Sequence, residues 1–237
     1  MHRIAVVIPA FNEEKAITAV VHEIHDAAAA TGLSLTPVVV NDCSLDNTGQ
    51  VISLLDCVAL QLPVNLGIGG AVQTGFKYAW RNGYTHAVQV DGDGQHPPGE
   101  IIKLYDKMEK GEYDVMIGSR FIEYQGFQSS VIRRTGINYF RYLNQLLVGA
   151  KVYDSTSGFR MLNRKALAIV VEDYPDEYPE PEAIVLYSKH HLKIGEAPVQ
   201  MRERQGGVSS IGSFSAVYYM FKVTIAIFFT FLRQVRK

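Results

Sequence analysis

Cysteine is scarce in this chain, and the two cysteines present have no metal-binding spacing. Cys43 and Cys57 form no C-x-x-C pair and have no matching cluster of histidines. We therefore expect neither a disulfide framework nor a structural zinc site, and this cysteine usage is typical of a reducing compartment.

An excess of positive charge is also missing. The chain has 23 Lys and Arg residues against 24 Asp and Glu residues, with a net charge of −1. Nucleic-acid binding requires a basic stripe or patch, so we expect no nucleic-acid partner. The apolar share of 47% and the length of 237 residues suit one large α/β domain with a sizeable core.

Long apolar runs are absent from all but the C-terminal end. The N-terminus enters a strand at once and resembles no signal peptide, which favours a cytoplasmic location. Residues 214–232 carry a single charge, Lys222, and are borderline for the roughly 20 residues of a membrane span. A helix here could pack on the domain, join two copies of the chain, or lie on the cytoplasmic face of a membrane. We assign residues 1–212 to the main domain and 213–237 to this C-terminal hydrophobic helix.

Strand and helix patterns alternate along the first half of the chain. We expect strands at 3–8, 36–40, 58–62, 85–90 and 114–117, with helices at 13–30, 67–80 and after Pro97-Pro98. This alternation predicts a doubly wound, mostly parallel sheet. Such sheets bind ligands at the carboxyl ends of their strands, where residues 9–12, 41–42 and 91–93 are expected to line one crevice. Residues 123–131 are expected to form a mobile loop, and 132–147 an amphipathic helix.

Two aspartates separated by one glycine follow the fourth expected strand. Asp91 and Asp93 are placed so that both carboxylates can converge on one hard cation. Magnesium and manganese prefer oxygen ligands and usually complete their shells with substrate phosphates. The pattern therefore predicts a Mg²⁺ or Mn²⁺ site that takes a phosphorylated ligand.

Taken in order, six segments resemble the family-2 inverting glycosyltransferases, and are most similar to the branch of dolichyl- and polyprenyl-phosphate sugar synthases. The segments are 7–14 (VIPAFNEE), 40–48 (VNDCSLDNT), 65–71 (NLGIGGA), 91–95 (DGDGQ), 117–120 (IGSR) and 157–160 (SGFR). The resemblance implies a GT-A-like fold with a nucleotide-binding crevice. It also implies metal-dependent transfer of a sugar from a nucleoside diphosphate sugar to a polyprenyl phosphate or a lipid-linked glycan, in cell-surface polysaccharide or glycolipid synthesis.

The same resemblance implies roles for individual residues. Asp91 and Asp93 would hold the metal, with Asp93 as the stronger candidate for direct coordination. Asn41 and Cys43 depart from the family's usual Asp-Asp-Gly-Ser, which leaves the nucleotide base open. Donor binding would fall to Pro9, Ala10, Asn12, Glu13, Asp42, Gly67, Gly70, Asp91 and Gln95.

Arginines and glutamates supply the expected acceptor side. Guanidinium groups bind phosphate bidentately, which makes candidates of Arg120, Arg160, Arg202 and Arg204. A hydroxyl acceptor also needs a carboxylate base, whereas a lipid phosphate is already anionic and needs cations more. Glu180 and Glu182 are the candidate bases. We expect them to alternate on an extended backbone, with Glu182 facing the crevice at the start of a helix at Ala183.

Two other functions are weighed against a transferase. A sugar-1-phosphate nucleotidyltransferase would need a glycine-rich N-terminal loop with a basic signature, where this chain has Pro-Ala-Phe-Asn-Glu-Glu. A catalytically idle nucleotide-sugar-binding subunit of a membrane complex would bind nucleotide with metal but show no turnover. The intact pair of Asp91 and Asp93 favours the enzyme.

Overall fold

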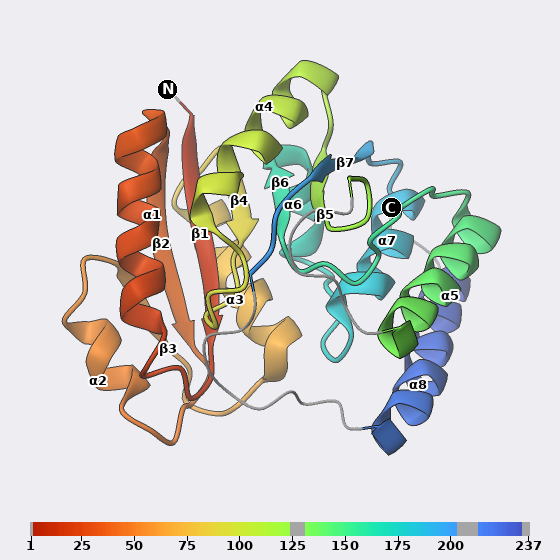
Figure 1. The fold of residues 1–237 in the computed structure, drawn as a ribbon, viewed down its shortest axis with the longest axis horizontal. Helices are drawn as coiled ribbons and strands as arrows, with labels where there is room; N and C mark the ends of the chain where they lie inside the picture. The colour runs from red at the N-terminus through yellow and green to blue at the C-terminus, as the bar shows by residue number, and fades with distance from the viewer. Residues whose placement is uncertain (1, 124–130, 203–212, 234–237) are drawn as a thin grey trace.

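A computed structural model of the chain describes residues 2–123, 131–202 and 213–233 (Figure 1). Its centre is a seven-stranded sheet in the order β3-β2-β1-β4-β6-β5-β7. The strands are β1 (Arg3–Ala10), β2 (Ser34–Asn41), β3 (Val58–Gln61), β4 (His86–Gln89), β5 (Val115–Ser119), β6 (Arg160–Asn163) and β7 (Ile194–Pro198). Only β6 runs antiparallel to its neighbours, β4 and β5, so the expected mostly parallel sheet is confirmed.

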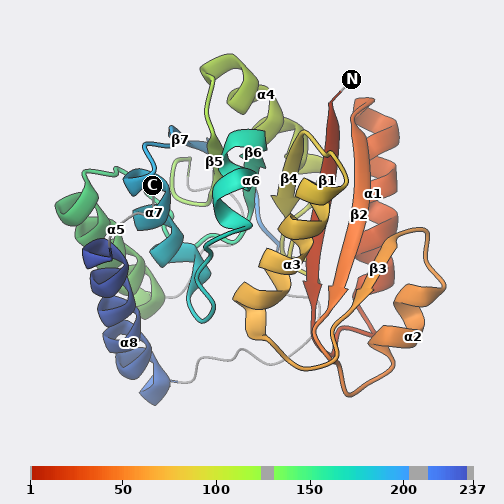
Figure 2. The same ribbon diagram turned by 180° about the vertical axis from the view of Figure 1, so that it is seen from behind.

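Helices cover both faces of this sheet. They are α1 (Ile17–Thr31), α2 (Thr48–Ser53), α3 (Gly67–Arg81), α4 (Ile101–Gly111, after the short helix η1, Pro98–Glu100), α5 (Val131–Val148), α6 (Arg164–Val170), α7 (Pro179–Lys189) and α8 (Ser213–Leu232). Figure 1 shows α1 and α4 on one face, and Figure 2 shows α3 and α6 on the other.

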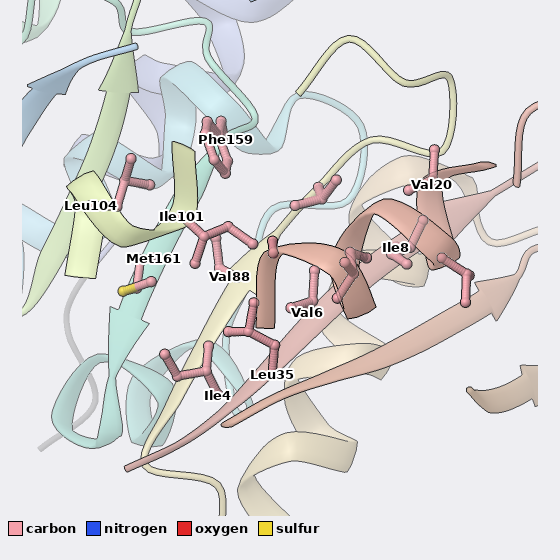
Figure 3. Packing of buried hydrophobic residues seen from close by; sticks show 14 of the residues in the cluster. Ile4, Val6, Ile8, Val20, Leu35, Val88, Ile101, Leu104, Phe159 and Met161 are labelled. Atoms are coloured by element: carbon pink, nitrogen blue, oxygen red, sulfur yellow. The ribbon is translucent and has the colours of Figure 1, made fainter. Parts of the chain in front are cut away.

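Alternation along β1 explains the two layers. Ile4, Val6 and Ile8 pack with residues of α1 and α4, as Figure 3 shows, whereas Ala5 and Val7 pack with α3. All five are fully buried, because successive side chains of a strand point to opposite faces. Parallel strands covered on both sides therefore have nearly continuous apolar sequences, as β1 and β2 do.

The C-terminal helix α8 packs against the rest of the domain. Val223 and Ile227 are fully buried with Phe140 of α5 and Val185 of α7. Each such aliphatic side chain contributes about 1.5–3 kcal/mol through burial. Of the three interpretations of this segment, packing on the domain is therefore observed. The expected domain boundary lies outside the described residues, as does the expected loop at 123–131 except for its two ends, of which Val131 already belongs to α5.

The other side of α5 and α8 is exposed. The exposed large side chains of these two helices are called the α5–α8 apolar surface below. They are Tyr139, Tyr142, Leu146, Tyr218, Phe221, Ile225, Phe228, Phe229 and Leu232. Within the part of the chain that the structure describes, no helix has the length and apolarity needed to cross a membrane.

Candidate active site

The polar segments that follow β1, β2 and β4 meet in one cleft of about 720 Å³. This volume lies within the usual range of small-molecule sites. The cleft is lined by Pro9, Ala10, Phe11, Asn12, Glu13, Asp42, Asn65, Gly67, Ile68, Ala71, Asp91, Gly92, Asp93 and Glu180. Three strand ends, the start of α3 and the start of α7 thus build a single site.

The loop after β1 is held by the loop after β2. Asn12 adopts a left-handed conformation with φ of 58°, which asparagine tolerates better than most residues. Its side-chain oxygen accepts the Leu45 N–H at 2.8 Å, and its own N–H donates to Ser44 Oγ at 3.0 Å. The Glu13 N–H donates to Thr48 Oγ1 at 2.8 Å. These bonds fix the backbone of 12–13 on the wall of the cleft.

Asp42 orders the turn that leads into α3. Its carboxylate accepts the N–H groups of Leu66 at 2.7 Å and Gly67 at 2.9 Å, and the residue is only 4% exposed. Gly67 has φ of 76°, a conformation that favours glycine. Each carboxylate oxygen has a further lone pair, so Asp42 can accept from a ligand while it holds this turn.

The other glycines of this motif serve packing. A Cβ on Gly69 would lie 2.2 Å from the carbonyl oxygens of Pro175 and Asp176, and one on Gly70 would lie 2.6 Å from Leu66 Cβ. Gly70 does not line the cleft, in contrast to Gly67. The structure therefore places only Gly67, of the two glycines expected to bind the donor, on the cleft wall.

Asp91 and Asp93 both line the cleft and are fixed by neighbours. Gln89 Nε2 donates to Asp91 Oδ1 at 3.1 Å, and Asp93 Oδ1 accepts the Gln95 N–H at 3.0 Å. His96 Nδ1 accepts the Asp91 N–H at 3.1 Å, and the imidazole is buried in a stack on Phe159. The sequence predicts Gln95 as a ligand contact, but this residue does not line the cleft.

The donor set at this point fits a hard divalent cation. Two carboxylates from one short loop and a third, Glu180, face the same space. A Cβ on Gly92 would lie 3.1 Å from the Pro9 carbonyl oxygen and 3.4 Å from Glu13 Cγ, so the glycine allows the two loops to approach closely. Oxygen-rich sets of this kind suit Mg²⁺ and Mn²⁺.

The two candidate bases lie on a helix, and the structure reverses the expected choice between them. Helix α7 begins at Pro179, so Glu180 and Glu182 belong to its first turn and not to an extended segment. Residues two apart on a helix face nearly opposite sides, at about 100° per residue. Glu180 lines the cleft, while Glu182 accepts a hydrogen bond from Thr230 of α8. The expectation that Glu182 faces the crevice is therefore wrong.

The environment of Glu180 perturbs its titration. Burial raises the pKa of this carboxyl above its ordinary value, the charge of Arg160 opposes the rise, and the charge of Asp91 adds to it. A raised pKa is typical of carboxyl groups that exchange protons at functional sites. Sequence reasoning identified Glu180 but gave its partner Arg160 a different role.

The three predicted cationic residues that the structure describes do not reach the cleft. Arg120 donates from Nε and Nη2 to Asp154 at 2.7 Å each, and Arg160, only 1% exposed, donates to the carbonyl oxygens of Ser157 and Ser155. Arg202 pairs with Glu23 on the surface of α1 at 2.8 Å. None of these three described arginines lines the cleft, and Arg204 lies outside the described residues.

Asn65 and Ile68 line the cleft but were not predicted as site residues, whereas Phe11 belongs to the segment 9–12 that was expected there. Asn65 Nδ2 donates to the Asp42 carbonyl oxygen at 3.1 Å. Its position just before the glycine motif is the signal that sequence reasoning passed over. Ile68 is apolar and 40% exposed on the cleft, which no sequence pattern reveals, and Phe11 is 45% exposed.

The mixed sheet with a cleft at the ends of β1, β2 and β4 is that of the GT-A glycosyltransferases. The profile of one family, Glycosyl transferase family 2, matches residues 5–170. The chain belongs to this family and is a glycosyltransferase.

Two relatives act on polyprenyl-type phosphates according to their names. The chain is 30% identical to the UDP-N-acetylglucosamine–dolichyl-phosphate N-acetylglucosaminyltransferase of Methanococcus voltae, over 83% of this chain and 84% of the relative. It is 29% identical to the polyprenol monophosphomannose synthase of Mycolicibacterium smegmatis, over 93% of this chain and 85% of that protein. The resemblance to this branch is therefore confirmed.

Solved structures confirm the fold. The glucosyl-3-phosphoglycerate synthase of Mycobacterium tuberculosis, in complex with Mn²⁺, uridine diphosphate and glucosyl-3-phosphoglycerate, matches with a TM-score of 0.72 and 18% identity. The match covers 97% of this chain and 80% of that one. The same enzyme with Mg²⁺ and uridine diphosphate matches with a TM-score of 0.70.

Proposed function

We propose that this glycosyltransferase moves a sugar, with inversion, from a nucleoside diphosphate sugar to a polyprenyl phosphate at the cytoplasmic face of a membrane. The observation that carries the proposal is the convergence of Asp91, Asp93 and Glu180 on the cleft beside the Asp42 turn. The names of the two relatives support the acceptor class.

Asp91 and Asp93 would hold a Mg²⁺ or Mn²⁺ ion that neutralises charge developing on the nucleoside diphosphate as the sugar–phosphate bond breaks. Asp42 and the loop of residues 12–13 would hold the nucleoside, because Asp42 supplies a fixed acceptor and hydrogen bonds from the loop's backbone N–H groups fix the loop on the same wall. Inversion requires a single displacement, so the chain needs no nucleophile of its own.

Glu180 supports a second candidate acceptor. A carboxylate with a raised pKa at the cleft is suited to remove a proton from a sugar hydroxyl. A lipid-linked glycan would present such a hydroxyl, whereas a polyprenyl phosphate would not need the base. The Glu180→Gln variant separates them: turnover falls strongly with a glycan acceptor and stays within a few-fold of wild type with a phosphate acceptor.

The α5–α8 apolar surface supports a location at the membrane. Aromatic side chains such as Phe221, Phe228 and Phe229 are half or more exposed on α8. Helices with aromatic faces bind at the boundary of headgroups and acyl chains. This contact would bring the enzyme to the membrane surface, where a lipid-borne acceptor resides. Contact between two copies of the chain is the competing use of this surface.

The test combines binding with turnover. UDP-N-acetylglucosamine, UDP-glucose and GDP-mannose are offered with Mn²⁺ and a detergent-dispersed polyprenyl phosphate, to wild type and to Asp93→Asn. The exposed Asp106 of α4 supplies the control variant Asp106→Asn. We expect transfer with one donor, its loss in Asp93→Asn, and wild-type turnover in the control.

Two results would contradict the proposal. A ligand at about 100 times its Kd stabilises a protein by roughly 2.7 kcal/mol. Metal-dependent stabilisation by a nucleotide without transfer to any acceptor would indicate an idle nucleotide-sugar-binding subunit. No stabilisation by any nucleotide would refute the donor site at Asp42, Asp91 and Asp93.

A further inference from the structure

Two imidazoles and a carboxylate gather at the end of the sheet opposite the cleft. His2 precedes β1, His86 is the first residue of β4, and Glu109 lies in the last turn of α4. One ligand atom from each residue lies within 4.8 Å of the others. Figure 1 shows the N-terminus and α4 together at this end.

His86 presents one ring nitrogen to Glu109 and has the other occupied. The residue is 4% exposed, and its Nδ1 lies 3.0 Å from Thr85 Oγ1. The Thr85 hydroxyl donates its hydrogen to the Arg3 carbonyl oxygen at 2.9 Å, so it accepts from His86 Nδ1. The lone pair of Nε2 then faces Glu109 Oε1 at 3.3 Å.

A cation between His86 Nε2 and Glu109 Oε1 stabilises this contact, and it can be a proton on the imidazole or a metal ion. A histidine fixed through one nitrogen by a hydroxyl, with the other nitrogen directed at a carboxylate, has the arrangement of a metal ligand with its supporting hydrogen bond.

His2 completes the group from the other side. Its Nδ1 lies 3.7 Å from Glu109 Oε2, and the Tyr105 hydroxyl lies 2.9 Å from the same nitrogen. A tetrahedral ion with bonds of about 2.0–2.1 Å has ligand atoms about 3.3 Å apart. The separations of 3.3 and 3.7 Å are close to this spacing but run to different oxygens of Glu109. The exposed His2 ring would have to turn and give up its contact with the Tyr105 hydroxyl to share an ion with the other two side chains.

We propose that His2, His86 and Glu109 form a second metal site, which binds a zinc-like divalent transition ion and is chemically distinct from the all-oxygen cleft. Two imidazoles and one carboxylate select Zn²⁺, Co²⁺ or Ni²⁺ over Mg²⁺. The same ion would fix the N-terminus, the start of β4 and the end of α4.

The position of the site gives it a structural role. The segment from His86 to Glu109 runs out along β4, through the Asp91–Asp93 loop, and back along α4. An ion bound by His86 and Glu109 would therefore link the two ends of this segment, at the end of the sheet opposite the cleft. Helix α4 has 11 residues and rises about 16 Å, so the ion would lie far from the reacting groups.

The test uses the full chain without a histidine tag, stripped with a chelator and then titrated with Zn²⁺ or Co²⁺. Calorimetry should show that one equivalent of metal ion binds tightly to each chain, and that this binding is retained in the Asp93→Asn variant. Tm should rise by about 5–10 °C at roughly 100 times Kd. Tetrahedral Co²⁺ would add visible absorption that an all-oxygen site does not give.

Variants identify the ligands. Glu109→Gln and His2→Ala change exposed side chains and should weaken Zn²⁺ binding at least tenfold without loss of the fold. His86→Ala should do the same if the variant folds. The exposed His22 of α1 supplies the control variant His22→Ala, which should bind as wild type does. Binding that survives Glu109→Gln and His2→Ala, or that disappears with Asp93→Asn, would overturn the proposal, as would no binding at micromolar Zn²⁺. None of these results depends on sugar transfer.

Discussion

Arg120 and Asp154 form a buried ion pair beside the candidate active site. The Asp154 side chain is 0% exposed and the Arg120 side chain 10%. Asp154 accepts from Arg120 Nε and Nη2 at 2.7 Å each and from the Arg120 backbone N–H at 3.1 Å. Replacement of Arg120 by methionine keeps the backbone bond and removes both charged ones. A carboxylate is then left without its counter-charge in a site closed to water.

The expected cost follows from this geometry. Removal of one partner of a buried ion pair costs about 3–5 kcal/mol, because the other charge stays buried and uncompensated. For a domain of this size each kcal/mol lowers Tm by about 2–4 °C. Arg120→Met should therefore lower Tm by roughly 6–20 °C. The surface pair of Arg202 with Glu23 provides a control, since Arg202→Met should cost about 1 kcal/mol or less.

A double-mutant cycle in urea denaturation tests the reasoning. The Arg120→Met/Asp154→Leu protein replaces the whole pair by apolar side chains and should recover most of the lost stability. Suppose instead that the free energy of unfolding of Arg120→Met is within about 1 kcal/mol of the wild-type value, while its KM for a phosphate acceptor rises. The guanidinium would then be a substrate ligand, as the sequence predicts, and the structural reasoning would be refuted.

Three further results are expected. Gly69→Ala places a Cβ 2.2 Å from two carbonyl oxygens and should lower stability by about 1–3 kcal/mol in thermal unfolding, whereas Gly99→Ala meets nothing and serves as control. Because burial raises the Glu180 pKa, protonation favours the fold. This contribution is present below pH 4.5 and lost as pH rises through the folded pKa, so Glu180→Gln should flatten that part of the pH–stability profile. Phe229→Ser should reduce sedimentation with anionic vesicles, and Leu54→Ser, whose side chain is exposed on helix α2's side of the molecule, should not; equal loss or no loss would refute the membrane contact.

Strands β1, β2, β4 and β5 were predictable because burial on both faces leaves a largely apolar sequence, whereas the edge strand β3 shows half-buried Val58 and Leu60 alternating with exposed residues. β6 and β7 have no such pattern. β6 begins with the buried Arg160 and has only four residues, while β7 contains a glycine and ends in a proline. Their pairing with β5 is decided by the register of the sheet, which overrides weak local preference.

The glutamate pair shows how a long-range contact decides a local choice. Proline at the start of a helix has no N–H to lose, so Pro179 and Pro181 fit the first turn of α7, where the sequence suggested an extended segment. The helix phase then sends the two glutamates to opposite sides. Glu182 meets Thr230, a partner 48 residues further along the chain. No pattern near residue 182 contains that information.

The arginines were expected near the site, and the structure gives two of them a different task. Asp154 binds Arg120, while the carbonyl oxygens of Ser155 and Ser157 bind Arg160, so both guanidinium groups hold one turn, residues 154–158. At the end of this turn, a Cβ on Gly158 would lie 2.7 Å from Gln89 Nε2 and 3.4 Å from Asp91 Oδ1. The turn is thus packed directly behind Asp91. Sequence motifs mark residues that a site needs, but whether an arginine contacts the ligand or holds the wall depends on which acceptors the fold brings to it.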